Sequence, residues 1–122
     1  MAGLDEKEEE LVELLTSMSL GRNVARTLVC LAGMEEATSS QIERATGLRQ
    51  PEVSTAINEL RERGWVSKRD IKRERKGRPV HSYRLAIPFE EIIGEVEKKE
   101  RSRIAKMEED ISRLKSILKK GK

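Results

Sequence analysis

Basic side chains gather in one short part of the chain, between residues 61 and 84. This stretch has ten basic and three acidic residues and a net charge of +7, although the whole chain of 122 residues has a net charge of +3. Lysine and arginine at this density form either a solvated face or a surface for the phosphates of a nucleic acid. Which of these two roles the basic residues have depends on the helices and strands that carry them. The basic residues are Arg61, Arg63, Lys68, Arg69, Lys72, Arg73, Arg75, Lys76, Arg78 and Arg84.

Residues for catalysis or metal binding are scarce. Cys30 lies in an apolar segment, which is typical of a core thiol, and a single cysteine forms no internal disulfide. His81 alternates with Tyr83 and Leu85 along an expected strand, which favours a packing role over a ligand role. The sequence has no paired cysteines, phosphate-binding glycine loop or zinc-protease motif. We therefore expect no enzyme, no metal and no cofactor.

Length and composition narrow the class further. With 36% hydrophobic and 39% charged residues, a chain of 122 residues closes one small core. No stretch approaches the roughly 20 apolar residues of a membrane span, and the acidic first ten residues are unlike a secretory signal. We expect a soluble, cytoplasmic protein with no membrane partner. Only two Asn and two Gln among many Lys, Arg and Glu residues indicate a thermophilic source.

Two helices are expected in the first third of the chain. Residues 4–18 carry apolar side chains at helical spacing, so this acidic segment is amphipathic and needs a partner surface. Gly21 interrupts the pattern, and a second helix from Val24 to Gly33 is apolar nearly all round, which predicts that it is buried. The first stripe is formed by Leu4, Leu11, Leu14, Leu15 and Met18.

The next two helices have the spacing of a helix-turn-helix. Thr38 and Gln41 form a capping-box signature at the start of a short helix over Ser39–Thr46, which Gly47 closes in the left-handed conformation. Pro51 suits the first turn of the following helix. Because only a few residues separate the two, they form a tight helix-turn-helix. The second helix has an inner face of Val53, Ala56, Ile57 and Leu60.

A basic hairpin and a long helix follow. Residues 65–74 and 80–86 are expected to form strands, and Pro88 opens the final helix. The tail carries an apolar seam whose spacing alternates between three and four, as in two heptads of a coiled coil. The flanking charges support pairing in parallel or antiparallel direction, and the alternative is a tail that folds back on its own domain. The apolar seam consists of Ile104, Met107, Ile111, Leu114 and Leu118.

The order of these elements resembles that of the winged helix-turn-helix regulators. Residues 19–66, SLGRNVARTLVCLAGMEEATSSQIERATGLRQPEVSTAINELRERGWV, and the hairpin GRPVHSYRL at 77–85 resemble the archaeal TrmB-like group and, more distantly, MarR and ArsR regulators. This resemblance implies a mainly α protein with a small β-hairpin (α+β), a winged helix-turn-helix with N- and C-terminal dimerisation helices. The paired cysteines of ArsR metal sensors are absent, and a helix stands where full-length TrmB proteins carry a sugar-binding domain.

Three segments are therefore expected. Residues 1–18 form an N-terminal amphipathic helix, residues 19–87 form the winged helix-turn-helix DNA-binding domain, and residues 88–122 form a C-terminal helix for coiled-coil dimerisation. Two apolar stripes on so small a chain are expected to be buried between two copies. The predicted dimerisation residues are Leu11, Leu14, Leu15, Met18, Ile104, Met107, Ile111, Leu114 and Leu118.

The recognition helix, residues 50–62, turns a polar face away from its buried side. Asn58 and Gln50 can each pair with adenine through an amide, and Arg49 can donate two hydrogen bonds to guanine. The expected contacts on this helix are Arg49, Gln50, Pro51, Ser54, Thr55 and Asn58. On the wing, residues 66–86, the arginines are expected in a minor groove or on phosphates. The expected wing contacts are Arg73, Arg75, Lys76 and Arg78.

These features predict a homodimeric, sequence-specific transcription regulator that binds double-stranded DNA; they name no effector ligand. Duplex DNA is favoured over RNA because a protruding helix fits the major groove of B-form DNA. A winged-helix protein-interaction module is one alternative, although it needs no basic wing tip. The other is an architectural chromatin-type protein without sequence preference, against which Glu52 and Glu59 count because each repels the DNA backbone.

Overall fold

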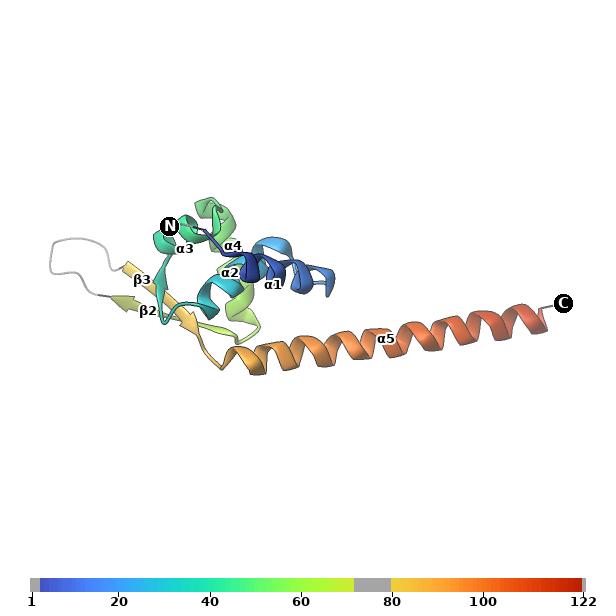
Figure 1. Cartoon of the computed structure of the whole chain (residues 1–122). Coiled ribbons are helices and arrows are strands. Elements are labelled where there is room, and N and C mark those ends of the chain that lie inside the picture. Colours follow the sequence, from blue (N-terminus) through green and yellow to red (C-terminus); the bar gives the residue numbers. More distant parts are fainter. Residues whose placement is uncertain (1–2, 72–79, 122) are drawn as a thin grey trace. The chain divides into compact units, whose positions relative to one another are not determined.

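The computed structural model describes residues 3–71 and 80–121, which form five helices and three strands. The chain divides into two units, Met1–Phe89 and Glu90–Lys122. The described part confirms a mostly helical protein with a small antiparallel sheet. The elements are α1 (Glu6–Ser17), α2 (Arg22–Ala32), β1 (Ala37–Thr38), α3 (Ser39–Thr46), α4 (Gln50–Glu62), β2 (Val66–Ile71), β3 (Val80–Leu85) and α5 (Phe89–Lys120) (Figure 1).

Helix α1 begins at a capping box. The Asp5 carboxylate accepts from the Glu8 amide at 2.7 Å, and the Glu8 carboxylate accepts from the Asp5 amide at 2.9 Å. The helix packs on α2 and buries Val12 and Leu15. The expected apolar stripe omitted Val12, which is fully buried, whereas Leu14 is half exposed. The inward face of α1 therefore shares Leu15 with the predicted stripe but includes Val12 in place of Leu14.

Helix α2 is the centre of the core, as its all-round apolar pattern predicts. It packs on α1, α3 and α4. Because three helices cover it, most of its side chains lie out of contact with water, and its polar residues Arg22, Asn23 and Arg26 remain at least partly exposed. Its buried residues are Val24, Ala25, Thr27, Leu28, Val29, Cys30 and Leu31.

Helices α3 and α4 form the predicted helix-turn-helix. The Thr38 hydroxyl accepts from the Gln41 amide at 3.3 Å, and the Gln41 side chain accepts from the Thr38 amide at 2.8 Å. Gly47 ends α3 with φ 77°, a conformation that costs a glycine little. Pro51 lies in the first turn of α4, where a missing amide hydrogen breaks no helical bond. The four residues expected on the inner face, Val53, Ala56, Ile57 and Leu60, are all buried.

A three-stranded antiparallel sheet in the order β1-β3-β2 completes the first unit. Strands β2 and β3 form the hairpin that we call the wing, with Val66 opposite Leu85 and Ile71 opposite Val80. Strand β1, which the sequence analysis did not anticipate, pairs Ala37 with Tyr83. Strand β3 is therefore central and has partners on both sides.

The second unit contains most of α5, a continuous helix of 32 residues. At about 1.5 Å per residue it is about 48 Å long. Every residue from 101 to 121 is exposed, and the exposed fractions along the apolar seam run from 48% at Ile111 to 77% at Leu118. Within the described ranges, no helix has the length and apolar content to cross a bilayer.

Candidate nucleic-acid interface

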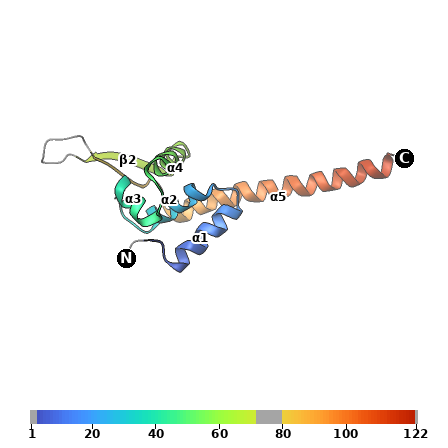
Figure 2. The same cartoon turned by 90° about the horizontal axis from the view of Figure 1, so that it is seen from above.

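The exposed face of α4 brings together the residues predicted to contact DNA. Its inner face is held by the core, and α4 also lies beside β2 of the wing (Figure 2). A rigidly packed helix with one polar, solvent-facing side is the geometry that reads a DNA groove. The exposed residues on this side, together with the residue that precedes the helix, are Arg49, Gln50, Pro51, Ser54, Thr55 and Asn58.

Two acidic residues of α4 have partners within the chain. The Arg49 amide donates to the Glu52 carboxylate at 2.8 Å, which satisfies one of the free amides at the helix start. The Arg63 guanidinium pairs with Glu59 at 2.9 Å and also lies over the ring of Trp65, 5.0 Å from its centroid. Both carboxylates therefore have structural contacts within the chain. Their presence is weaker evidence against binding to DNA without sequence preference than the sequence alone indicates.

A depression of about 280 Å³ lies between α2 and α4, next to the predicted contact Thr55. Asn23, from the first turn of α2, lines it together with Pro51 and Thr55. Asn23 is not evident as part of this surface from the sequence alone, because about thirty positions separate it from the recognition helix. The structure places its half-exposed amide beside the polar face of α4.

The turn between α3 and α4 is fixed by its own side chains. The Thr46 hydroxyl donates to the Ile42 carbonyl at 2.7 Å and accepts from the Leu48 amide at 3.2 Å. The Gly47 amide donates to the Glu43 carbonyl at 2.8 Å. These hydrogen bonds among residues 42–48 help to set the direction in which the chain enters α4.

The base of the wing is held by an ion pair that reaches from the loop before β1. The guanidinium of Arg69 on β2 donates two hydrogen bonds to the carboxylate of Glu36, the Nη2 bond at 2.9 Å. These bonds, with smaller contributions from Ser82 and Arg84, lower the pKa of Glu36 from 4.5 to about 2. Ser82 is buried in this arrangement, so the two neighbours Ser82 and Tyr83 are both buried and strict alternation fails on β3.

His81 does not pack as the sequence predicts. It is exposed and lies opposite Asp70 in the wing, and its Nδ1 is 2.6 Å from the Asp70 carboxylate. The prediction was wrong because Tyr83 is buried in the core, whereas His81 lies one residue from the end of β3 that is remote from the core. The two side chains form a cross-strand polar pair instead.

Comparison with known proteins agrees with this geometry. Residues 19–77 match the model of the MarR family. This part of the chain, from the residues before α2 into the segment after β2, is therefore similar to the winged-helix domains of that family. Among proteins of curated function, none matches this sequence.

Solved structures share the fold of this chain. A possible transcriptional regulator from Methanosarcina mazei aligns with a TM-score of 0.64 and 11% identity, over 86% of each chain. TrmBL2, an archaeal chromatin protein, aligns with a TM-score of 0.61 and 18% identity over 92% of this chain. The chain spans 40% of the length of TrmBL2. NadR, solved with 4-hydroxyphenylacetate, aligns with a TM-score of 0.54 and 18% identity, over 94% of this chain and 80% of that chain.

Some of the predicted DNA contacts lie outside the described residues. These are the wing residues Arg73, Arg75, Lys76 and Arg78. Within the sheet, Lys68 and Arg84 are exposed, whereas Arg69 forms an ion pair with Glu36. The basic segment is therefore partly used for internal ion pairs, a use that charge counting alone does not reveal.

The predicted dimerisation residues fall into two groups. Leu15 is buried within its own chain and Leu11 is half buried, so neither needs a second copy to cover it. Leu14 and Met18 on α1 are exposed, as are the five residues of the apolar seam on α5.

Cys30 is a core thiol, as predicted. It is buried in α2, and burial raises its pKa from 9.0 to about 11, with a smaller contribution from Glu8. A thiol with a raised pKa is a poor nucleophile and a poor metal ligand at neutral pH. The described part of the chain also contains no group of three or more His, Cys, Asp or Glu side chains that could hold a metal ion.

Proposed function

We propose that this protein is a sequence-specific transcription regulator that binds double-stranded DNA as a homodimer. The observation that carries the proposal is the exposed polar face of α4 on a helix whose opposite side is locked in the core. In this arrangement α4 enters the major groove, and the wing lies on the phosphate backbone or in the adjacent minor groove.

Each side chain on this face has a distinct role in the proposal. Asn58 and Gln50 present amides that donate and accept at once, which matches the edge of adenine, and Arg49 matches guanine. Ser54 and Thr55 bind phosphates or base edges. Lys68 and Arg84 on the wing strands bind the backbone, as do Arg73, Arg75, Lys76 and Arg78, which lie between them in the sequence.

Two copies of the chain form the active species in this proposal. The apolar seam of α5 leaves five large apolar side chains exposed, and Leu14 and Met18 add an exposed pair on α1. A second copy removes such surfaces from water, at about 25 cal/mol for each square ångström of apolar area. A dimer also presents two recognition helices, so the preferred site is an inverted repeat with half-sites about one DNA turn apart.

A salt titration tests the DNA-binding surface directly. With about six phosphates neutralised per dimer, the logarithm of the affinity for duplex DNA falls with the logarithm of the salt concentration at a slope of roughly −5. Fluorescence anisotropy of a labelled duplex between low and moderate salt measures this slope. A flat response is incompatible with the proposed surface.

An architectural DNA-binding role is the second candidate. It is favoured by the internal roles of Glu52 and Glu59, because carboxylates that cap a helix or pair with Arg63 do not select against unspecific binding. Its fold neighbour TrmBL2 is described as a chromatin protein. Selection of binding sites from random-sequence duplexes separates the two candidates: a regulator enriches one motif, whereas an architectural protein enriches none.

A further inference from the structure

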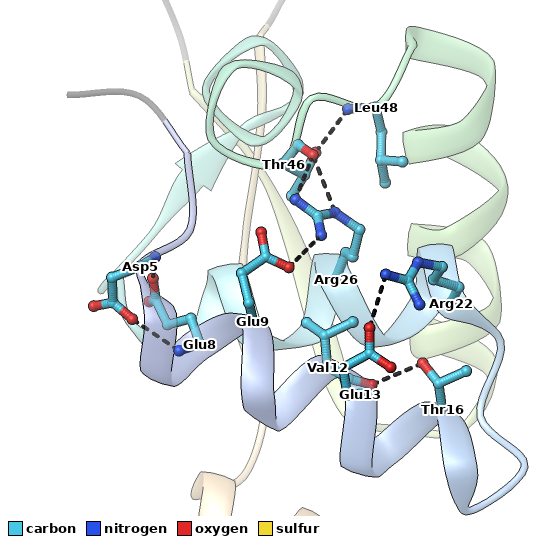
Figure 3. A network of polar contacts seen from close by, with 10 residues as sticks. All are labelled: Asp5, Glu8, Glu9, Val12, Glu13, Thr16, Arg22, Arg26, Thr46 and Leu48. Atoms are coloured by element: carbon cyan, nitrogen blue, oxygen red, sulfur yellow. Dashed lines mark hydrogen bonds and ion pairs between the residues drawn. The ribbon is translucent and has the colours of Figure 1, made fainter.

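One arginine joins three helices of the first unit. The guanidinium of Arg26 on α2 donates from Nη1 to the Glu9 carboxylate on α1 at 2.8 Å (Figure 3). It also donates to the carbonyl oxygen of Thr46, the last residue of α3, from Nε at 3.1 Å and from Nη2 at 2.9 Å. Its side chain is only 17% exposed. The planar fork of arginine makes both attachments possible at once.

The carbonyl that Arg26 binds belongs to the turn that leads into α4. The last carbonyls of a helix lack partners within the helix, and a cation there is favoured by the helix dipole. The hydroxyl of the same residue, Thr46, accepts from the Leu48 amide. Arg26 therefore holds one end of the turn whose other end is the first residue before the recognition helix, Arg49.

The second attachment of Arg26 is to α1, the helix that lies outside the helix-turn-helix. The ion pair of Arg26 and Glu9 is not needed to hold α1 against α2, because Val12 and Leu15 are already buried on α1. The exposed ion pair of Arg22 and Glu13 also joins the same two helices, at 3.1 Å. The pair of Arg26 and Glu9 differs in that it continues into α3. It is the more buried of the two pairs and is less screened by solvent.

We propose that Arg26 is a positioning residue that transmits the placement of α1 to the turn before α4. A movement of α1 displaces Glu9, the guanidinium follows its counter-ion, and the Thr46 carbonyl loses one or both of its hydrogen bonds. The surface of α1 that carries the exposed Leu14 and Met18 is then coupled to DNA affinity, so a partner copy bound there changes how well α4 reads DNA. The DNA readout of this inference rests on the proposed function; the coupling itself does not.

A comparison of two glutamates on α1 tests the coupling. Glu9→Gln removes the charge that holds Arg26, and Arg26→Lys keeps the charge but loses the planar fork. Glu13→Gln is the matched control, because it breaks the other ion pair between α1 and α2, which does not reach α3. Hydrogen exchange at the Leu48 amide reports on the turn, and anisotropy with a duplex selected by the wild type reports on DNA affinity.

We expect Glu9→Gln and Arg26→Lys to speed exchange at Leu48 and to weaken DNA binding about tenfold, within the usual range of coupling between sites. Glu13→Gln changes neither. An unchanged Leu48 amide in Glu9→Gln, or an equal change in Glu13→Gln, overturns the inference. A wild type that binds no duplex refutes the proposed function, whereas the exchange comparison still decides the coupling.

A charge swap separates positioning from simple stabilisation. The double variant Glu9→Arg with Arg26→Glu restores the ion pair between α1 and α2, but it leaves the Thr46 carbonyl facing an acceptor instead of a donor. We expect the swap to leave exchange at Leu48 fast and DNA binding weak. If the swap restores both to wild-type values, the carbonyl contact has no part in the effect and the inference fails.

Discussion

Thr27 is the least satisfied residue of the core. It is fully buried in α2, and among the described residues its hydroxyl is the buried side-chain group without a hydrogen-bond partner. A buried polar group without a partner costs about 1 to 3 kcal/mol. We therefore expect Thr27→Val to raise the free energy of unfolding by about 1 kcal/mol or more, measured by urea denaturation.

Thr46→Val is the matched control for this prediction. Thr46 is also buried, but its hydroxyl has two partners, the Ile42 carbonyl and the Leu48 amide. Removing that hydroxyl lowers the free energy of unfolding, because the amide of Leu48 loses its acceptor. Equal destabilisation by the two substitutions would contradict our account of Thr27.

Asn58 is the residue on which sequence preference is expected to depend. It is exposed on the polar face of α4, so its removal leaves the fold intact. Loss of a base-edge contact costs about 1 to 3 kcal/mol at one base pair, whereas loss of a phosphate contact weakens all sites alike. We expect Asn58→Ala to relax the preference at one position and Arg75→Ala to weaken every site. Selection from random duplexes by each variant measures both, and an unaltered motif with Asn58→Ala refutes its assignment.

Residue roles were predictable where the local pattern decides them. The capping roles of Thr38 and Gln41 and the burial of Cys30 follow from neighbouring positions, and all three predictions are confirmed. The partner of His81 comes from the opposite strand of the wing, and the partner of Arg26 comes from another helix. Pairs of this kind depend on tertiary register, which one segment of sequence does not encode.

At the scale of the elements, the wing depends on a carboxylate that lies outside it. Because the pKa of Glu36 is lowered from 4.5 to about 2, the folded state binds its proton less readily than the unfolded state does. The contact of ionised Glu36 with Arg69 therefore stabilises the folded state above pH 4.5, and this stabilisation is lost as the pH falls toward 2. We expect the melting temperature of the wild type to fall over this pH range. The melting temperature of Glu36→Gln should fall less, because this variant has no carboxyl group at position 36 to protonate; thermal unfolding at successive pH values measures both.

Glu62→Gln provides the control for the acid titration. Glu62 is exposed at the end of α4, and its substitution removes one carboxylate of the same type. We expect its pH profile to follow that of the wild type. A Glu36→Gln profile that also follows the wild type shows that the contact with Arg69 contributes nothing to the folded wing.

The helices and the wing strands could be predicted because their signals are local. The bounds of α3 follow from a capping box and a left-handed glycine, and the inner face of α4 follows from its period. Strand β1 has two residues, too few to show an alternation of polar and apolar side chains. It is defined only by its pairing with β3, which the sequence of residues 37–38 does not reveal. The inward face of α1 was misjudged for a related reason, since the position of α2 decides that Val12 is covered.

At the scale of the whole molecule, assembly is expected to depend on the apolar seam. Replacing Ile111 and Leu114 with lysine puts two charges into a surface that pairing would have to dehydrate. We expect this double variant to sediment as a monomer. Its affinity for a full inverted repeat falls steeply, because the second half-site no longer binds at high effective concentration.

Ser112 and Ser116 give a control on the same helix. They are exposed and lie off the apolar seam in the heptad, so Ser112→Lys with Ser116→Lys adds the same charge without entering the paired surface. We expect this variant to remain a dimer with wild-type affinity. A wild type that sediments as a monomer at micromolar concentration refutes the dimer and leaves the winged-helix assignment in place.

The strand order β1-β3-β2 leaves the sheet with two edges of different kinds. One edge is β1, which at two residues is too short to recruit another strand. The other is β2, whose outward row of amides and carbonyls is crowded by the charged side chains of Lys68, Arg69 and Asp70. Short or charged edges resist pairing with a foreign sheet. If the protein binds neighbouring DNA sites as proposed, we expect its wings to stay separate instead of joining edge to edge into a continuous sheet.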